Sequence, residues 1–290
     1  MANDKKVWLI TGASRGLGRE LARVVLDRGE IVVGTSRDGT LDLDPGSGTF
    51  HGLALDLGVP GRERAVVEQA QALHGRIDVL VNNAGQGLLG AVEEAEPTEV
   101  DQVFAVNFFG PLRLIQAVLP FMRQQRSGQI VNVSSIAGFA PASGSGLYAA
   151  AKFALEGMSE SLAQEVTPLG IRVLVVEPGA FRTDFLASQS IRHSAARIED
   201  YAATSGKTVA YLAQIDGKQL GDPVLGAKAI VQAFESPEAP LHLVLGSDSL
   251  RRSRERIARL TGEFDRWEAV SIGTDFPTGL ASPERPATSR

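Results

Sequence analysis

The chain has 290 residues, enough for one large α/β domain or two small ones with a sizeable buried core. Apolar residues make up 43% of it and charged residues 22%, which is typical of a globular protein. The net charge of -5 disfavours nucleic acid or an anionic membrane surface as the main partner. Because the sequence contains 0 cysteines, disulfides and cysteine-ligated metals are excluded.

The sequence also bears on cellular location. The first residues, MANDKKVWLITGASRG, contain no long apolar segment of the kind that a secretory signal carries. No apolar run approaches the roughly 20 residues that a membrane-spanning helix requires. A cytoplasmic enzyme without a membrane partner is therefore expected.

Short runs rich in valine, isoleucine and leucine alternate with amphipathic patterns along the chain. The runs are VWLIT at Val7, IVVGTS at Ile31, DVLVNN at Asp78, QIVNVSS at Gln129, RVLVVEPG at Arg172 and LHLVLG at Leu241. Helical periodicity covers Leu17–Arg28, Arg62–Leu73, Thr98–Gln124 (two helices divided near Gly110-Pro111) and Tyr148–Thr167. Strands that are apolar on both faces and alternate with helices predict a parallel sheet covered on both sides. The predicted fold is a single-domain α/β fold, a Rossmann-type doubly wound parallel sheet with helices on both faces.

A glycine-rich segment, TGASRGLGRE, follows the first predicted strand. Gly12, Gly16 and Gly18 lack a Cβ atom, so the backbone can approach a phosphate at the start of the next helix. The spacing G-x-x-x-G-x-G differs from the generic dinucleotide fingerprint, and a turn that merely closes a βα unit has a similar composition. The position of the segment directly after the first strand favours phosphate binding.

The second predicted strand ends in GTSRD, where nucleotide folds often place an acid that binds the ribose 2′-hydroxyl. This sequence has Ser36 at that point, followed by Arg37, and Arg15 lies within the glycine turn. Since guanidinium groups bind phosphate through charge-assisted hydrogen bonds, the two arginines favour NADP(H) over NAD(H). Asp38 is a competing feature, and two solvated surface arginines remain the alternative.

Polar side chains cluster in three later segments. Asn107 interrupts an apolar helical run, Ser134 and Ser135 end a predicted strand, and Tyr148 lies four residues before Lys152. On a helix these last two side chains share one face. Strand carboxyl ends converge on the ligand crevice of an open α/β sheet, so all of these groups are expected near the glycine turn.

In combination these motifs resemble the short-chain dehydrogenase/reductase family, over roughly Lys6 to Leu245. The matching segments are TGASRGLG, Asp56 in LDL, NNAG at Asn82–Gly85, Asn107, Ser135, Tyr148-x-x-x-Lys152, and Pro178-Gly179 with Thr183. Ser135, thirteen positions before Tyr148, matches the family's catalytic serine better than Ser134 does.

The resemblance implies two sets of site residues and a nicotinamide cofactor, expected to be NADP(H). The implied catalytic residues are Asn107, Ser135, Tyr148 and Lys152. The implied cofactor-binding residues are Gly12, Ser14, Arg15, Gly16, Leu17, Gly18, Arg37, Asp56, Leu57, Asn83, Ala84, Gly85, Tyr148, Lys152, Pro178, Gly179 and Thr183. No metal is expected, because the 4 histidines form no ligand motif.

The expected chemistry is proton transfer by Tyr148 between its phenol and a carbonyl or hydroxyl oxygen. A free phenol has a pKa near 10, so Lys152 and an oxidised nicotinamide are expected to lower the pKa of Tyr148. Ser135 would orient the substrate oxygen and stabilise its developing charge. The resemblance gives Lys152 a second role on the ribose, and gives Asn107 a water that links Lys152 to solvent.

Two other classes of function compete with this oxidoreductase. A dinucleotide-binding protein that has lost catalysis would be marked by loss of Tyr148 or Lys152, and both are present. Nucleotide-sugar epimerases and dehydratases share Tyr-x-x-x-Lys, but they usually carry T-G-x-x-G-x-x-G, which the spacing of Gly12 and Gly16 opposes.

The predicted substrate pocket is apolar and aromatic, which suits a hydrophobic ketone or secondary alcohol. The candidate pocket positions, several of which could instead be core, are Gly87, Ala137, Phe139, Leu147, Phe181, Phe185 and Leu186. Residues 1–272 are expected to form one NADP-binding catalytic domain, with 185–222 as a mobile lid and 273–290 as a disordered tail.

A homodimer or homotetramer is expected, formed through the helix that contains Tyr148. One face of this helix carries a stripe of mostly small residues that permits close helix approach: Ala150, Phe153, Ala154, Gly157 and Ser161. The partners expected are therefore a small carbonyl or alcohol substrate and further copies of the chain.

Overall fold

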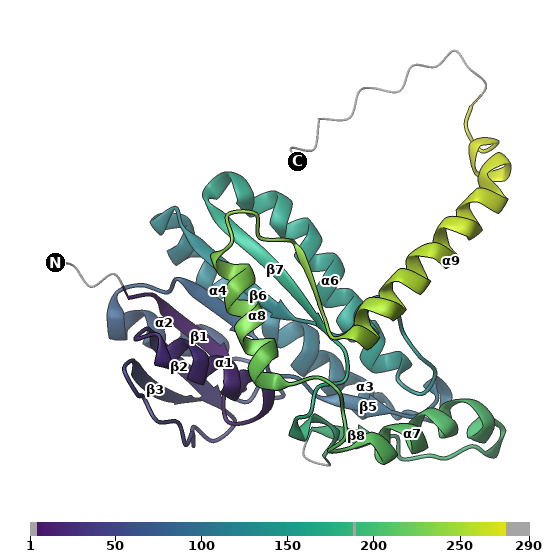
Figure 1. Cartoon of the computed structure of the whole chain (residues 1–290), viewed down its shortest axis with the longest axis horizontal. Helices are drawn as coiled ribbons and strands as arrows, with labels where there is room; N and C mark the ends of the chain where they lie inside the picture. Colours follow the sequence, from purple (N-terminus) through teal and green to yellow (C-terminus); the bar gives the residue numbers. More distant parts are fainter. Residues whose placement is uncertain (1–4, 188–189, 277–290) are drawn as a thin grey trace.

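A seven-stranded parallel sheet forms the centre of the protein in the computed structural model, which describes residues 5–187 and 190–276 (Figure 1). The strand order is β3-β2-β1-β4-β6-β7-β9. The bounds are β1 Val7–Thr11, β2 Ile31–Ser36, β3 Thr49–Ala54, β4 Val79–Asn82, β6 Gly128–Val133, β7 Ile171–Pro178 and β9 His242–Leu245. The chain therefore builds the sheet outward in both directions from β1 and β4, and the crevice between these strands is where such folds bind nucleotides.

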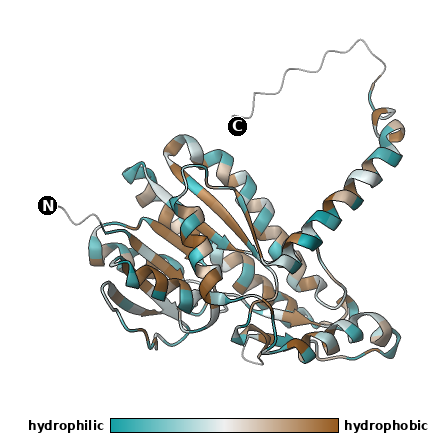
Figure 2. Cartoon of the chain, viewed as in Figure 1, coloured by the Kyte–Doolittle hydropathy of each residue, from teal (hydrophilic) through white to brown (hydrophobic). Residues whose placement is uncertain are grey.

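Helices cover both faces of the sheet, which confirms the predicted Rossmann-type fold. One face is covered by α1 (Gly16–Asp27) and α8 (Pro223–Glu235), and the other by α2 (Glu63–His74), α4 (Gly110–Gln125) and α6 (Gly146–Val166). Side chains alternate between the two faces along each strand, and the central strands are apolar on both faces because helices cover both. Figure 2 shows these strands as the hydrophobic interior of the body.

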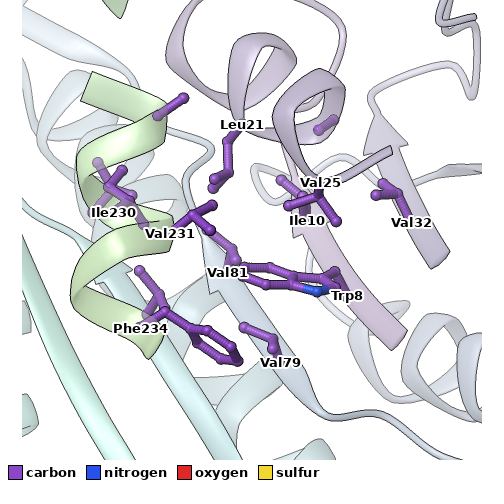
Figure 3. Packing of buried hydrophobic residues seen from close by; sticks show 14 of the residues in the cluster. Trp8, Ile10, Leu21, Val25, Val32, Val79, Val81, Ile230, Val231 and Phe234 are labelled. Atoms are coloured by element: carbon purple, nitrogen blue, oxygen red, sulfur yellow. The ribbon is translucent and has the colours of Figure 1, made fainter. Parts of the chain in front are cut away.

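The layer under α1 and α8 is packed around an aromatic pair (Figure 3). The ring centroids of Trp8 on β1 and Phe234 on α8 lie 4.7 Å apart at an interplanar angle of 43°. Leu21 and Val25 of α1 pack beside them. This contact fixes α1, and with it the glycine turn that precedes α1, against the sheet.

The helix predicted over Thr98–Gln124 is not divided at Gly110-Pro111. It runs as α3 (Pro97–Phe104), a π-helical turn η2 (Ala105–Phe109) and α4. Proline is tolerated in the first turn of a helix because its missing N–H has no partner there, so Pro111 continues the helix after the π turn. The irregularity lies at the π turn, and such turns are frequent at functional sites.

The edges and the carboxyl-terminal part of the fold hold elements that the sequence patterns did not predict. Edge strand β3 is half-exposed and contains His51 and Gly52, so it shows no apolar run. Helix α9 (Ser247–Ile272) leaves the body after β9 and projects away from it (Figure 1). Part of the expected tail, residues 277–290, lies outside the described residues, so its disorder stays a prediction.

The expected lid, residues 185–222, consists of short elements and a small sheet. They are η4 Asp184–Leu186, β8 Ile191–His193, η5 Glu199–Tyr201, η6 Ala202–Gly206 and α7 Lys207–Ile215. Strand β8 pairs in parallel with β5 (Gly87–Leu89), which follows β4. The other short elements of the fold are η1 Val92–Glu94, α5 Ile136–Phe139 and η3 Thr167–Leu169.

Among the described residues, one helix, Pro97–Gln125, is long and apolar enough to cross a membrane by length and composition. Its four core side chains Leu114, Ile115, Val118 and Met122 pack into the layer beneath the sheet. A core helix passes the same test, so this helix is weak evidence for a membrane span. In the sequence this stretch is not a continuous apolar run, because polar residues such as Asn107 and Arg113 interrupt it.

Candidate active site

A cavity of about 790 Å³ opens at the carboxyl ends of the central strands. Of the residues predicted to bind a cofactor, all but Gly18 line it: Gly12, Ser14, Arg15, Gly16, Leu17, Arg37, Asp56, Leu57, Asn83, Ala84, Gly85, Tyr148, Lys152, Pro178, Gly179 and Thr183. The predicted catalytic Ser135 also lines the cavity, whereas Asn107 is fully buried behind it. Segments far apart in the sequence therefore meet around one space.

The glycine turn between β1 and α1 has the backbone geometry of a phosphate-binding loop. Gly12 and Gly16 adopt left-handed φ angles of 66° and 58°, which favour glycine. A Cβ atom on Gly18 would lie 2.2 Å from Nδ2 of Asn83, so only glycine fits there too. Gly18 thus serves close packing of α1 on the sheet and does not line the cavity.

Asn83, which follows β4, fastens this turn to the neighbouring strand. Its side-chain amide donates to the carbonyls of Thr11 (2.9 Å) and Gly12 (3.2 Å). The hydroxyl of Thr11 accepts the backbone N–H groups of Asn83 (3.0 Å) and Ala84 (3.1 Å). The NNAG segment therefore holds the turn rigidly, and rigidity of this kind preorganises a dinucleotide site.

The end of β2 forms the other part of the nucleotide region. Ser36 and Arg37 line the cavity, whereas Asp38 is not among the lining residues. The carboxylate of Asp38 accepts the hydroxyl of Ser36 (3.0 Å) and the N–H of Thr40 (2.9 Å). These hydrogen bonds, that from Thr40 first, lower the pKa of Asp38, so this acid is charged and held in the turn.

Arg15 contacts the lid as well as the cavity. One of its guanidinium nitrogens donates to the hydroxyl of Ser190 at 2.8 Å. Ser190 precedes β8 and lies 175 positions later in the chain. The glycine turn and the lid are therefore joined directly across the mouth of the cavity.

Tyr148 and Lys152 share one face of α6, as their spacing predicts, and both are buried. Burial raises the pKa of Tyr148 to about 12, against a lowering by a hydrogen bond with Ser135. Burial also lowers the pKa of Lys152 to about 8. The expected lowering of the Tyr148 pKa is therefore not present in the protein alone, because burial outweighs the neighbouring polar groups.

The ammonium of Lys152 is fixed by the strand beside it. It donates a 2.8 Å hydrogen bond to the carbonyl of Val133 at the end of β6. Its nitrogen lies 5.9 Å from the centroid of the Tyr148 ring. Ser135, two residues after Val133, caps α5, with its hydroxyl accepting the N–H of Ala137 at 3.1 Å.

Asn107 lies in the π turn, and its amide group is occupied by backbone partners. It donates to the carbonyls of Gln86 and Val103, both at 2.8 Å, and accepts the N–H of Gln86 at 3.2 Å. A Cβ atom on Gly85 would lie 3.1 Å from Oδ1 of Asn107 and 3.7 Å from the nitrogen of Lys152. Asn107 therefore holds the segment between β4 and β5 next to Lys152.

Comparison with known proteins identifies the family. The family model described as short chain dehydrogenase matches residues 6–193. The 3-ketodihydrosphingosine reductase of Bacteroides thetaiotaomicron is 43% identical over 197 residues, covering 68% of this chain and 72% of that protein. A short-chain dehydrogenase structure from Streptomyces avermitilis is 39% identical, with a TM-score of 0.86 over 95% of this chain and 100% of that chain. A metagenomic short-chain oxidoreductase in complex with NADP is 36% identical, with a TM-score of 0.56 over 61% and 83% of the two chains.

The chain belongs to the short-chain dehydrogenase family. It is therefore an oxidoreductase of a family whose members use a nicotinamide cofactor. The left-handed glycines of the turn and the polar residues around the cavity fit such a dinucleotide. Among residues 5–187 and 190–276, no three His, Cys, Asp or Glu side chains are grouped so that they could hold a metal ion.

A buried polar network behind the site of this dehydrogenase was not predicted. Glu156, one turn after Lys152 on α6, accepts the hydroxyl of Ser134 at 2.5 Å. Burial, against a lowering by the Ser134 hydrogen bond and with a smaller contribution from the Glu177 carboxylate, raises the pKa of Glu156 to about 7. Glu177 in turn contacts Nδ1 of His242 at 2.6 Å, and the Glu177 hydrogen bond raises the pKa of His242. The sequence signal was the acid at i+4 from Lys152 and i+8 from Tyr148, on the same helix face.

The substrate side of the cavity departs from prediction at two positions. Gly87, Ala137, Phe181, Phe185 and Leu186 line it, as expected, whereas Phe139 and Leu147 do not. Leu147 is one residue from Tyr148, so the helix turns it about 100° away, and it packs against the apolar cluster around Leu88 and Val103.

Two further parts of the wall come from elements that the sequence motifs do not reveal. Lys207, Thr208, Tyr211, Leu212 and Ile215 line the cavity from the lid helix α7 and its carboxyl end. Asp248, Arg251 and Arg252 line it from the start of α9. The carboxylate of Asp248 accepts the N–H of Ala180 at 2.9 Å, which ties α9 to the Pro178-Gly179 turn.

Proposed function

We propose that the protein is an NADP(H)-dependent dehydrogenase that interconverts a ketone or aldehyde and an alcohol. The observation that carries this proposal is the meeting of Ser135, Tyr148 and Lys152 with the glycine turn around one cavity. The NADP complex of the 36% identical oxidoreductase supports the cofactor class. When bound, the reduced cofactor supplies a hydride, and the protein supplies position, exclusion of water and a proton.

Tyr148 would donate that proton to the substrate oxygen during reduction. With a pKa of about 12 its phenol is protonated at neutral pH, which is the state that reduction requires. Oxidation requires the phenolate, and the positively charged nicotinamide ring of the oxidised cofactor would favour it when bound beside Tyr148. Ser135, hydrogen-bonded to Tyr148, would orient the same oxygen.

Lys152 and Asn107 would position these groups. Lys152 would hold the ribose hydroxyls and keep a cation next to the Tyr148 ring. The side chain of Asn107 is bonded to the backbone of the segment that carries Gly85. A water that links Lys152 to solvent would therefore be held by backbone groups near the π turn. Both roles follow from the family resemblance and agree with the burial of the two side chains.

The preference for NADP(H) is supported by the charges at the end of β2. Arg15 in the glycine turn and Arg37 after β2 both line the cavity. The acid nearest to them among the lining residues in sequence is Asp56, which is expected to bind the adenine. Because Asp38 is held by Ser36 and Thr40, its carboxylate is turned to the loop and not to the cavity. Two guanidinium groups then favour a 2′-phosphate.

The substrate is proposed to be a hydrophobic carbonyl compound or secondary alcohol. The apolar side chains on the substrate side of the cavity are Phe181, Phe185, Leu186, Leu212 and Ile215, and Lys207, Arg251 and Arg252 add charge at its outer part. The ring of Phe185 lies 6.0 Å from that of Tyr148, so an apolar group flanks the reacting position. The name of the 43% identical relative, 3-ketodihydrosphingosine reductase, agrees with a ketone as the substrate class.

The decisive experiment is a panel of ketones, aldehydes and alcohols of graded length and charge, assayed by absorbance with NADPH, NADH, NADP⁺ and NAD⁺. We expect turnover of apolar members and higher kcat/KM with the phosphorylated cofactor. A blank on the whole panel, combined with tight NADPH binding, would instead favour a protein that binds a dinucleotide without catalysis.

The lid is proposed to close over the substrate on the cavity side of β8. Its apolar anchors Ile191, Leu212 and Phe185 pack with Leu89, and its backbone is bound to Glu94 through the N–H of Ile198 (2.8 Å). A segment built from short elements opens locally at lower free energy than the central strands of a sheet do. Hydrogen exchange should be faster in 185–222 than in β1 and β4, and slower after NADPH and substrate are added. Equally slow exchange in both regions would contradict the lid.

A homo-oligomer formed through α6, in the cytoplasm, completes the proposal. Ala150, Phe153, Gly157 and Ser161 lie on the exposed face of α6, Ala154 is half-buried, and Arg256 of α9 lies over one side of the Phe153 ring. A Cβ atom on Gly157 would meet no atom within 4 Å. Close approach of a second helix is therefore possible on this face.

A further inference from the structure

Helix α9 carries an apolar stripe on the part that projects from the body (Figure 1). Ile257, Leu260, Phe264 and Trp267 follow each other at spacings of three and four residues, the a and d positions of a heptad. Three of them are exposed, Ile257 by 54%, Phe264 by 68% and Trp267 by 62%. Large exposed apolar side chains in one contiguous stripe mark an interaction surface.

The body of the protein covers only the beginning of this helix. Ser249 and Ser253 are buried, the guanidinium of Arg252 donates to the carbonyl of Ala140, and Arg256 lies over the ring of Phe153 at 5.6 Å. From Ile257 onward the stripe is exposed except for Leu260, which is half-buried. Figure 2 shows hydrophobic and hydrophilic residues alternating along this free length.

The charges on α9 are unevenly distributed along its axis. The segment Ser247–Arg259 contains five arginines and two carboxylates, a net charge of +3. The segment Leu260–Ile272 contains one arginine and three carboxylates, a net charge of -2. Two such helices attract each other when they lie antiparallel, because each basic half then meets an acidic half.

We propose that α9 is a homodimerisation helix, which pairs antiparallel with α9 of a second copy of this chain. In this register Ile257 packs against Trp267 of the second copy, and Leu260 packs against Phe264, which gives four apolar layers by symmetry. The two-fold symmetry makes the same stripe both surfaces of the interface, so the contact is closed and does not form fibres.

The flanking charges distinguish this pairing from a parallel one. Arg254 and Glu268 occupy the same heptad position two heptads apart, so antiparallel helices place each beside the other in two attractive pairs. A parallel pair would place Glu263 beside Glu268 twice, whereas the antiparallel pair leaves a single Glu263–Glu263 contact. The acidic second half also opposes binding of the stripe to an anionic lipid surface.

The first test compares oligomeric state for the full chain across micromolar concentrations by light scattering and sedimentation. Phe264→Glu with Trp267→Glu should raise the dissociation constant of the dimer at least 10-fold, or halve the oligomer if α6 provides a second interface. Ala258→Glu with Ala269→Glu adds the same charges on the opposite face of α9 and should leave assembly unchanged. A monomeric wild type, or equal assembly of the wild type and the apolar-stripe variant, would overturn the proposal.

The second test addresses orientation. Arg254→Glu and Glu268→Arg should each weaken the dimer about 3- to 30-fold, and the double swap should restore it. Because the chain has 0 cysteines, Thr261→Cys offers a single thiol that meets its own copy only in the antiparallel register, so a short bismaleimide should cross-link it and not Ala269→Cys. Failure of both the rescue and the cross-link would exclude antiparallel pairing.

The third test asks whether the apolar stripe of α9 binds a lipid surface in place of a second copy of the chain. Flotation of the wild type with phosphatidylcholine vesicles, with and without phosphatidylserine, should leave the protein unbound. Flotation that depends on Phe264 and Trp267, in a protein that is otherwise monomeric, would replace the second copy by a membrane.

Discussion

The two walls of the cavity differ in how the sequence builds them. One wall comes from strand ends and the start of α6, and its polar groups are fixed by hydrogen bonds to neighbouring strands, such as Lys152 to Val133 and Asn83 to Thr11. The other wall comes from the lid and the start of α9, and it mixes apolar side chains such as Leu186 and Leu212 with charged ones such as Lys207, Arg251 and Arg252. In the proposed function the first wall carries out the chemistry and the second binds the substrate, so mutations in the two walls should have different effects.

The largest expected effect tests the chemistry of the first wall. Tyr148→Phe removes only the proton-transferring oxygen, so the fold and NADPH binding should be retained while kcat falls about 10²- to 10⁴-fold. Tyr211→Phe makes the same change on the second wall, where Tyr211 is 59% exposed, and should alter kcat less than about threefold. If the two variants had similar activity, neither the proton transfer nor the contrast between the walls would hold.

The next effect concerns cofactor choice. A hydrogen bond to a charged group contributes about 1.5–3 kcal/mol, so Arg37→Ala should weaken NADPH roughly 10- to 150-fold and leave NADH nearly unchanged. Arg192→Ala, which removes a guanidinium from the lid side of the same cavity, is the matched control and should leave both cofactors nearly unchanged. Steady-state kinetics with both cofactors decide the matter, and a wild-type kcat/KM that favours NADH would refute the assignment.

Glu156→Gln tests the first wall through the pH dependence of kcat/KM. Its carboxylate raises the pKa of Tyr148 and of Lys152, so Glu156→Gln should lower both. Alcohol oxidation requires the phenolate, and the rise of kcat/KM with pH should therefore move to lower pH by less than about one unit. Glu160→Gln on the exposed side of α6 is the control.

The same substitution has a predicted effect on stability. The pKa of Glu156 rises from 4.5 to about 7 on folding, so its protonated form stabilises the fold below pH 4.5, and this contribution is lost as pH rises through 7. Above pH 7 the Gln variant should be more stable than the wild type, on the order of 1–3 kcal/mol. Urea unfolding at pH 5 and pH 8 measures this, and an equal difference at both values would contradict the buried carboxylate.

Much of the first wall could be predicted from the sequence because its residues lie at fixed offsets from strand ends. The Gly12 turn, the Asn83 segment and the Tyr148–Lys152 pair each follow directly from a strand or a helix repeat. The second wall has no such rule. Strand β8 pairs with β5, which lies about 100 positions earlier in the chain, and α9 is joined to the turn after β7 by the hydrogen bond from Ala180 to Asp248.

Two features of the first wall depend on tertiary structure. The motif identifies Asn107, but the π turn that places it, with Pro111 continuing the helix, depends on backbone geometry that a periodic pattern does not reveal. The raised pKa of Tyr148 likewise depends on burial, a tertiary property.

The smallest expected effect lies at the junction of the lid and the body. Asp222 caps α8, with its carboxylate accepting the N–H groups of Val224 (2.8 Å) and Leu225 (3.2 Å), and Pro223 occupies the first helical position. Asp222→Ala should reduce the free energy of unfolding by about 1 kcal/mol, whereas Asp222→Ser, which keeps an acceptor, should cost only a few tenths. Because Asp222 does not line the cavity, kcat/KM should stay within about twofold in both variants. Urea unfolding and steady-state kinetics test the two claims separately. A large loss of activity with little loss of stability would show that the end of the lid acts in turnover, and would remove the distinction between a catalytic wall and a wall that only binds.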